Sequence, residues 1–178
     1  MLMIFNVAQL LKSPIGTTQD VVLDDSDRLD LRDGEARLAG PITGHARLHR
    51  TNESIVVDGV AHIPVLLECS RCLTEFTTTL DVPLRETFYP TIDIETGLPV
   101  RAPEVESSFI IDDHHQVDLR EAIRQNLVLA LPLKPLCRED CKGLCAECGR
   151  DLNLEPHTHE TETRDERFAA LRQLLEAD

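Results

Sequence analysis

Six cysteines are the residues of this chain whose type and spacing point most directly to chemistry. Two form an isolated C-x-x-C, and four crowd into the segment PLCREDCKGLCAECG: Cys69 and Cys72, then Cys137, Cys141, Cys145 and Cys148. In a C-x-x-C a tight turn aims two thiolates at one ion, and zinc accepts four such ligands tetrahedrally. Gly149 follows the last cysteine, where a knuckle turn favours a residue that tolerates positive φ. Paired C-x-x-C units therefore predict a zinc site.

The spacing leaves open which four cysteines bind the ion. A local set needs no help from the rest of the fold: Cys137, Cys141, Cys145 and Cys148. A long-range set combines Cys69 and Cys72 with a downstream pair, and closing that long loop restricts the unfolded chain most. Because a C-x-x-C has the better bite for sharing an ion, we slightly favour Cys69, Cys72, Cys145 and Cys148, with Cys137 and Cys141 spare or replacing the last pair.

Two other kinds of cysteine chemistry compete with a metal site. Three disulfides are arithmetically allowed, but they need an oxidising compartment. The start of the chain, MLMIFNVAQLLKS, has no basic lead, and its apolar run is too short for a signal peptide. A redox C-x-x-C normally opens a helix that lowers the thiol pKa. Cys69 and Cys72 instead lie between two strand-like runs, IPVLLE and LTEFTTTL, which indicates a hairpin knuckle.

The elements that position these cysteines predict an α+β fold. Period-two alternation predicts a bent antiparallel sheet over residues 35–88, interrupted or bulged at Gly40-Pro41 and with Asp58-Gly59 as a turn or bulge. Apolar residues at helical spacing predict a helix over residues 119–131 that covers the sheet. Asp118 and Glu121 have the spacing of a capping box at its start. We expect residues 1–131 to form the sheet-and-helix part and residues 132–178 the cysteine-rich part, packed as one domain.

The flanking segments carry weaker patterns. Asn6 can cap a short helix over VAQLLK, and residues 17–23 are β-prone. Residues 89–108 are rich in Pro, Gly and acids, which predicts a long mobile loop, with Phe109–Ile111 returning as a short strand. Thr163 and Glu166 repeat the capping-box spacing before a last amphipathic helix that includes Phe168, Leu171, Leu174 and Leu175.

Composition excludes several classes of function. The net charge of −14 disfavours a surface that grips phosphate, and aromatic residues make up only 3% of the chain with no Trp, which disfavours a base-stacking platform. No apolar run is long enough for a membrane helix. Phosphate loops, dinucleotide-binding glycine motifs and G-x-S-x-G are absent from the sequence, so no catalytic residues are predicted. All-cysteine ligation indicates a closed structural zinc site in a non-enzymatic, cytoplasmic protein.

Histidines add little to this prediction. We expect His45, His49 and His62 to be strand-face residues, and His114 and His115 to lie in a polar turn. His157 and His159 are alternative ligands, but six cysteines already exceed the need of one ion. A direct RNA-binding module would need a basic patch, for which the candidates are Arg37, Arg47, His49 and Arg50.

Three segments together resemble the YceD family, whose members are also called large ribosomal RNA subunit accumulation proteins: VLLECSRCLTEF, VDLREAIRQNLVLALPLKPLC and CKGLCAECGRDLN. The N-terminal NVAQLLKSPIG fits as well. The resemblance implies a role in accumulation of 23S ribosomal RNA and assembly of the large ribosomal subunit. It also implies that the C-x-x-C of Cys69 and Cys72 is characteristic, and that the gene often neighbours one for a small basic large-subunit protein.

The acidic surface and this resemblance together suggest a partner. An acidic protein can hold a basic ribosomal protein by complementary charge and release it to the denser charge of RNA. We expect the partner to be a large-subunit precursor or a basic large-subunit protein, met by acidic stretches over residues 24–33 and 92–106. The competing hypotheses are a thiol-disulfide oxidoreductase using Cys69 and Cys72, or the RNA-binding zinc module.

Overall fold

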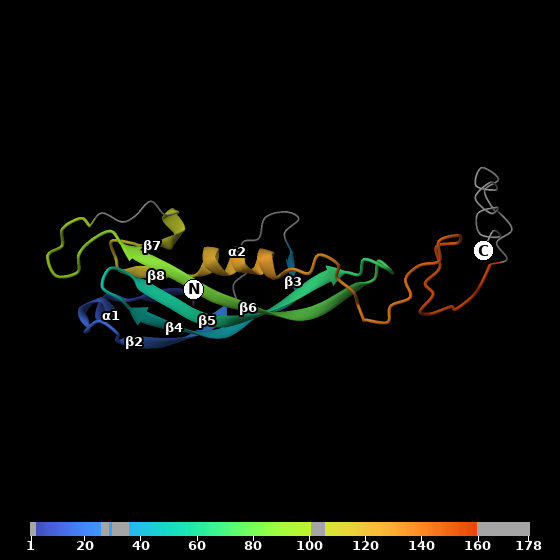
Figure 1. The fold of residues 1–178 in the computed structure, drawn as a ribbon, viewed down its shortest axis with the longest axis horizontal. Coiled ribbons are helices and arrows are strands. Elements are labelled where there is room, and N and C mark those ends of the chain that lie inside the picture. Colours follow the sequence, from blue (N-terminus) through green and yellow to red (C-terminus); the bar gives the residue numbers. More distant parts are fainter. Residues whose placement is uncertain (1–2, 26–28, 30–35, 101–105, 160–178) are drawn as a thin grey trace, which may run out of the picture.

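The fold is taken from a computed structural model that describes residues 3–25, 29, 36–100 and 106–159 (Figure 1). Its elements in chain order are β1 (Ile4–Asn6), α1 (Ala8–Lys12), β2 (Thr18–Asp25), β3 (Arg37–Leu38), β4 (Ile42–Arg50), β5 (Ile55–Glu68), β6 (Glu75–Pro90), the 3-10 turn η1 (Ser107–Phe109), β7 (Ile110–Ile111), β8 (Gln116–Asp118) and α2 (Arg120–Ala130).

One long hairpin organises the main sheet. β5 and β6 pair antiparallel along their whole length, from Ile55↔Phe88 to Glu68↔Glu75. The sheet order is β2-β4-β5-β6-β7, with β3 also on β5, and only the β6–β7 pair is parallel. The predicted α+β fold with an antiparallel sheet is confirmed, and β2 adds a strand before the expected start. The sheet stays open, and the far tip of the β5–β6 hairpin extends beyond the rest of it (Figure 1).

The two glycine-containing breaks predicted in the sheet turned out differently. Gly40-Pro41 does interrupt the predicted strand. β3 ends at Leu38, β4 begins at Ile42, and both pair with the same strand, β5. The prediction of a turn or bulge at Asp58-Gly59 is wrong, because β5 runs through it in regular register. A Cβ on Gly59 would lie 2.4 Å from the His45 carbonyl oxygen and 2.6 Å from the Ala46 Cα. Close approach of β4, rather than a turn, explains the glycine.

Gly59→Ala is therefore expected to destabilise the protein by about 1–3 kcal/mol, because backbone atoms of β4 must move to admit the methyl group. Urea unfolding followed by circular dichroism measures the loss. The matched control is Gly40→Ala, whose Cβ would meet only the Pro64 side chain, at 3.2 Å. Equal losses in the two variants would contradict the close-approach explanation.

α2 covers one face of the sheet and lies against β6 (Figure 1). Its inward residues Ala122, Ile123 and Leu127 are at most 1% exposed, as the helical spacing predicted. Burying the two larger side chains contributes about 1.5–3 kcal/mol each. The helix begins at Arg120, and Asp118 Oδ1 accepts the Arg120 backbone N–H (3.0 Å).

The predicted capping box does not form. Glu121 lies in the first turn of α2, where its carboxylate accepts hydrogen bonds from Arg124 Nε (2.8 Å) and Gln125 Nε2 (2.9 Å). The N-cap residue is Leu119, one position after the predicted Asp118, and it makes no side-chain capping hydrogen bond.

The N-terminal segment and the segment before α2 meet in a second, two-stranded sheet of β1 and β8. Asn6 Oδ1 accepts the Ala8 N–H (3.0 Å) at the start of α1, close to the expected cap. Asp112 Oδ1 accepts the backbone N–H groups of His114 and Gln116, so His114 and His115 lie in the predicted polar turn. β7 supplies the short return strand, and the ring of Phe109 packs against that of Phe88 with a centroid distance of 5.6 Å and a tilt of 47°.

Some predictions fall outside the described residues. These are the predicted last helix, whose residues fall within 160–178, and parts of the two acidic stretches, at residues 26–28, 30–33 and 101–105. Within the described ranges, the helices are too short or too polar to span a bilayer.

Candidate metal centre

The turn between β5 and β6 is a knuckle built on Cys69 and Cys72, as the two flanking strand patterns predicted. The Cys69 N–H donates to the Thr74 carbonyl (3.0 Å), and the Leu73 N–H donates back to the Cys69 carbonyl (2.9 Å). Leu73 takes a left-handed conformation with φ of 58°. For a leucine this conformation costs about 1–2 kcal/mol, so the tight turn is maintained by its surroundings rather than by local preference.

The chain after α2 is fastened to this knuckle by hydrogen bonds. The Ser70 N–H and hydroxyl both donate to the Pro135 carbonyl, at 2.8 and 3.0 Å. Arg71 Nη1 donates to the Cys141 carbonyl at 2.7 Å. These contacts place Cys137 and Cys141 opposite the knuckle. In the sequence, Cys137 lies 65 residues after Cys72, and Cys141 lies 72 residues after Cys69.

The four sulfur atoms of Cys69, Cys72, Cys137 and Cys141 lie within 4.8 Å of one another. The Sγ atoms of Cys69 and Cys141 are 3.8 Å apart, and those of Cys72 and Cys137 are 3.7 Å apart. Four Zn–S bonds of about 2.3 Å arranged tetrahedrally require sulfurs about 3.8 Å apart. The separations thus match a tetrahedral ion and are far longer than a disulfide bond of about 2.05 Å. This group can hold a metal ion.

Burial and electrostatics fit thiolate ligands. Cys69 is 0% exposed, Cys141 2% and Cys72 7%, so solvent has little access to a bound ion. Backbone N–H groups of Cys72 and Cys137 lower the pKa of the Cys69 thiol to about 6. Burial, by contrast, raises the pKa of the Cys137 thiol to about 12. A divalent cation among the sulfurs would favour the thiolate at every position, and a buried set of this kind suits a structural ion.

The pairing favoured from spacing is not the one the structure brings together. Cys69 and Cys72 meet Cys137 and Cys141, whereas Cys145 and Cys148 form a separate group with His157 and His159. The local set of four downstream cysteines is also split. From the sequence alone, these two histidines are more ligands than one ion needs. Their spacing after the C-x-x-C of Cys145 and Cys148 was the signal that could have indicated a second group. Cys137 and Cys141 precede the last pair directly, so either pair could have reached the knuckle.

With this geometry in place, comparison with known proteins gives a family. The profile described as "Large ribosomal RNA subunit accumulation protein YceD" matches residues 57–175, which includes every cysteine of both groups. The chain belongs to the YceD family. No solved structure matches it.

Curated relatives of this YceD family member come from mycobacteria and are described as uncharacterized. One from Mycobacterium leprae is 35% identical over 122 residues, covering 67% of this chain and 54% of the relative. Others, from Mycobacterium bovis and Mycobacterium tuberculosis, are 35% identical over 130 residues, covering 72% of this chain and 59% of each relative. The chain thus spans a little over half the length of the relatives it matches.

The basic patch considered for RNA binding is divided in this YceD protein, and two of its four residues are paired with carboxylates. Arg37 lies on β3 and forms an ion pair with Glu75, away from the candidates on β4. Arg47 Nε donates to Asp20 Oδ1 at 2.6 Å, which lowers the pKa of Asp20 and raises that of Arg47.

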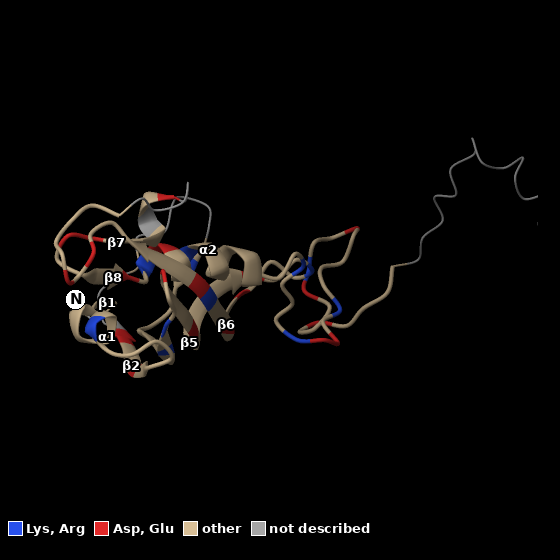
Figure 2. Cartoon of the chain, turned by 60° about the vertical axis from the view of Figure 1, so that its left-hand side comes forward, with Lys and Arg blue, Asp and Glu red and all other residues tan. Residues whose placement is uncertain are grey.

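Arg47 belongs to a row of alternating charge that crosses four strands. Asp20, Arg47, Asp58 and Arg85 face one another in register on β2, β4, β5 and β6. A second ion pair, Arg85–Asp58 at 3.6 Å, closes the row. Figure 2 likewise shows acidic and basic residues interspersed along β6 and in the cysteine-rich segment. Cations paired in this way offer little free positive potential to a phosphate backbone.

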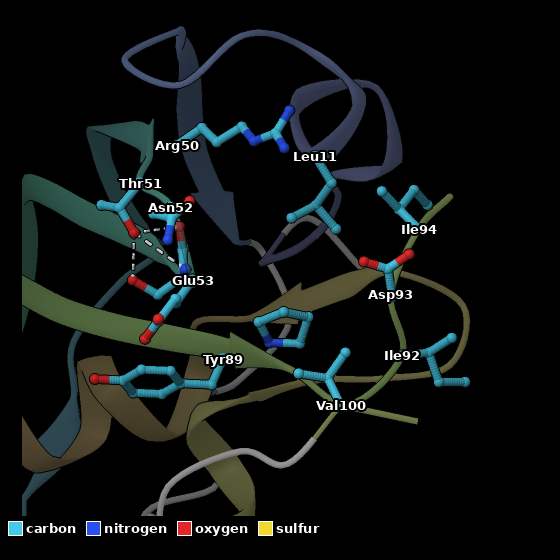
Figure 3. Close-up of a pocket in the computed structure, with 12 residues that line it drawn as sticks. Leu11, Arg50, Thr51, Asn52, Glu53, Tyr89, Ile92, Asp93, Ile94 and Val100 are labelled. Atoms are coloured by element: carbon cyan, nitrogen blue, oxygen red, sulfur yellow. Dashed lines mark hydrogen bonds between the residues drawn. The ribbon is translucent and has the colours of Figure 1, made fainter. Parts of the chain in front are cut away.

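Apart from the cysteine groups, the described part of the chain has a cleft of about 320 Å³ beside α1, the β4–β5 turn and the segment after β6 (Figure 3). Arg50, Glu53, Tyr89 and Asp93 line it together with apolar side chains. Thr51 and Ser54 bond each other there, and Asp93 accepts the backbone N–H groups of Glu95 and Thr96. Its described lining residues include neither a histidine nor a cysteine.

Proposed function

We propose that this YceD protein is a non-enzymatic factor that supports 23S ribosomal RNA accumulation and assembly of the large ribosomal subunit. The observation that carries the proposal is the family match over residues 57–175, whose description names ribosomal RNA accumulation and no reaction. The buried thiols of Cys69, Cys72 and Cys141 support the structural part of this proposal, because buried thiolates suit a structural ion.

The structural ion in this proposal is Zn²⁺, held by Cys69, Cys72, Cys137 and Cys141. Soft thiolates in a tetrahedral set select zinc over hard cations such as Mg²⁺ or Ca²⁺. By joining the β5–β6 tip to the segment after α2, the ion would make residues 1–131 and 132–178 one folding unit. The hydrogen bonds from Ser70 to Pro135 and from Arg71 to Cys141 support that view, since they cross the same boundary.

The competing functions have less support. A thiol-disulfide oxidoreductase needs an accessible low-pKa thiol, but Cys69 is 0% exposed. A direct RNA-binding module needs free cations, whereas Arg37 and Arg47 are paired with carboxylates. An acidic protein that holds a basic large-subunit protein is the partner hypothesis that the net charge of −14 favours.

Recovery of the tagged protein from growing cells tests the function directly. We expect it to bring down large-subunit precursors or a free basic large-subunit protein from the cytoplasm. Depletion of the protein should lower the ratio of 23S to 16S ribosomal RNA. If the tagged protein brings down neither precursors nor a basic protein, and the ratio of 23S to 16S ribosomal RNA is unchanged in depleted cells, the proposal is refuted. Reversible oxidation of Cys69 and Cys72 without bound metal would favour the oxidoreductase.

A further inference from the structure

We propose that Cys145, Cys148, His157 and His159 bind a second zinc ion. The chain would then carry two zinc sites in succession along residues 137–159, called the arm below. This inference does not depend on a ribosomal role, because it rests on the geometry of the arm alone. The four donor atoms lie within 4.8 Å of one another although up to 14 positions separate their residues in the sequence.

The backbone around Cys145 repeats the knuckle at Cys69. The Cys145 N–H donates to the Arg150 carbonyl at 2.8 Å, and the Gly149 N–H donates to the Cys145 carbonyl at 2.9 Å. These are the same sequence offsets as the Cys69–Thr74 and Leu73–Cys69 bonds of the first knuckle. Gly149 has a φ of 72°, as its position after the C-x-x-C predicted. The arm therefore contains a second turn of the kind that directs two cysteine sulfurs toward one ion.

The two histidines are oriented as metal ligands commonly are. In each ring Nε2 faces the sulfur of Cys148, at 3.1 Å for His157 and 3.3 Å for His159. The opposite ring nitrogen of His157, Nδ1, lies 2.7 Å from the Glu155 carbonyl oxygen, and Nδ1 of His159 lies 3.4 Å from a Glu147 carboxylate oxygen. In His157 the Glu155 carbonyl is an acceptor that fixes the tautomer in which Nε2 is the metal-binding nitrogen, and metal-ligating histidines almost always have such a partner. In His159 the Glu147 carboxylate lies on the same side of the ring, as an ion-pair partner.

The donor set selects the ion, and the distances are close to those it needs. Two thiolates and two imidazoles form a common structural zinc set, and bonds of about 2.3 Å to sulfur and 2.0 Å to nitrogen place S and N about 3.5 Å apart in a tetrahedron. The separations at Cys148 are a few tenths of an ångström shorter, so a small outward movement seats the ion. Cys148 and His159 are exposed, which makes this site more accessible to chelators than the buried four-cysteine group.

The second group is built directly onto the first. Asn153, which follows the second knuckle, donates from Nδ2 to the sulfur of Cys141 at 3.5 Å and accepts the Lys142 N–H at 2.8 Å. The Leu144 N–H donates to the Arg71 carbonyl at 3.1 Å. The first site thus anchors the base of the loop that carries the second. We expect the second ion to leave first under a chelator and the first ion to remain.

Metal analysis of the purified full chain tests the proposal. Wild type should contain two zinc ions per chain, and the double variant His157→Asn/His159→Asn should contain one while keeping the circular dichroism of the sheet. The matched control, His45→Asn/His49→Asn, changes two histidines on β4 that belong to neither group and should keep two ions. One ion in wild type, or two in the His157/His159 variant, would overturn the second site.

Cobalt substitution gives a readout that does not depend on stability. The visible spectrum of the Co²⁺ protein should contain one all-thiolate component and one with two thiolates and two imidazoles. The second component should disappear in His157→Asn/His159→Asn and persist in the β4 control. If that variant aggregates, Cys148→Ser replaces it, and loss of thiolate absorption equivalent to one whole site is expected. A spectrum with only the all-thiolate component in wild type would refute the proposal.

Discussion

Cys69→Ser is expected to release one zinc ion and to lower the melting temperature by about 10 °C. A site that is saturated about a thousandfold above its dissociation constant contributes about 4 kcal/mol, and in a chain of this size each kcal/mol shifts the melting temperature by about 2–4 °C. An ion held by the four-cysteine group would join the tip of the β5–β6 hairpin to a segment about 70 residues later, so its loss would also free the segment after α2. Metal analysis and calorimetry on the same sample measure both effects.

The choice of comparison variants separates the two ligand sets. Cys141→Ser should behave as Cys69→Ser does, because its sulfur lies in the same group. Cys148→Ser should leave the melting of the sheet nearly unchanged, since it is exposed and belongs to the other group. If Cys148→Ser destabilises the sheet as strongly as Cys69→Ser does and Cys141→Ser does not, the pairing favoured from spacing is correct. Cys137→Ser is a further variant of the same group. Because Cys137 is only half-buried, burial of the serine hydroxyl should contribute less to the loss of stability.

Local chemistry was readable from the sequence, but the pairing of distant segments was not. Two cysteines between strand-like runs predicted the knuckle, because a C-x-x-C and a hairpin turn are both set within a few residues. Which downstream pair meets that knuckle depends on where the chain goes after α2, and this follows from Ser70 and Arg71 bonding to carbonyls of the returning segment. No sequence periodicity encodes such contacts. His157 and His159 were passed over because their role appears only when two groups, rather than one, are formed.

The fold likewise was predictable where the pattern is local and not where distant segments pair. Alternation and helical spacing predicted the sheet and α2, since each pattern reflects the face that an element buries. The β1–β8 pair was missed because two three-residue strands, more than 100 residues apart, carry no pattern of their own. The prediction of a turn or bulge at Gly59 is wrong because a glycine needed for close approach of β4 looks the same in sequence as one needed for a turn.

Charge on the described surface bears on how this acidic YceD protein could meet a partner. On the sheet, Asp20, Arg47, Asp58 and Arg85 form one row and largely neutralise one another. The excess negative charge must therefore lie elsewhere. The stretch over residues 24–33 contains five acidic and two basic residues, and that over residues 92–106 contains four acidic and one basic residue, so each has a net charge of −3. Such stretches are suited to attract a basic protein over distances of about a Debye length.

Binding to a basic large-subunit protein is accordingly expected to weaken by roughly 10- to 100-fold between about 50 mM and 300 mM salt, because screening removes the long-range attraction that speeds association. Naked ribosomal RNA should bind weakly at both salt concentrations, since the net charge of −14 repels phosphate. Isothermal titration of each ligand at the two salt concentrations measures these differences. Tight RNA binding with no affinity for any basic ribosomal protein would overturn the partner hypothesis and favour the RNA-binding module.

A pair of charge variants locates the attraction within the chain. Asp27→Asn/Asp30→Asn/Asp33→Asn removes the net charge of the first acidic stretch and should weaken low-salt binding to the basic protein by about tenfold, with a shallower dependence on salt. The control Glu53→Gln/Glu68→Gln/Glu139→Gln changes the total charge equally, but at scattered exposed positions, and should have a much smaller effect. If both variants weaken binding equally, the attraction comes from total charge alone, and the acidic stretch has no specific part in it. If only the first does, the partner contacts the acidic stretch that follows β2 in the sequence.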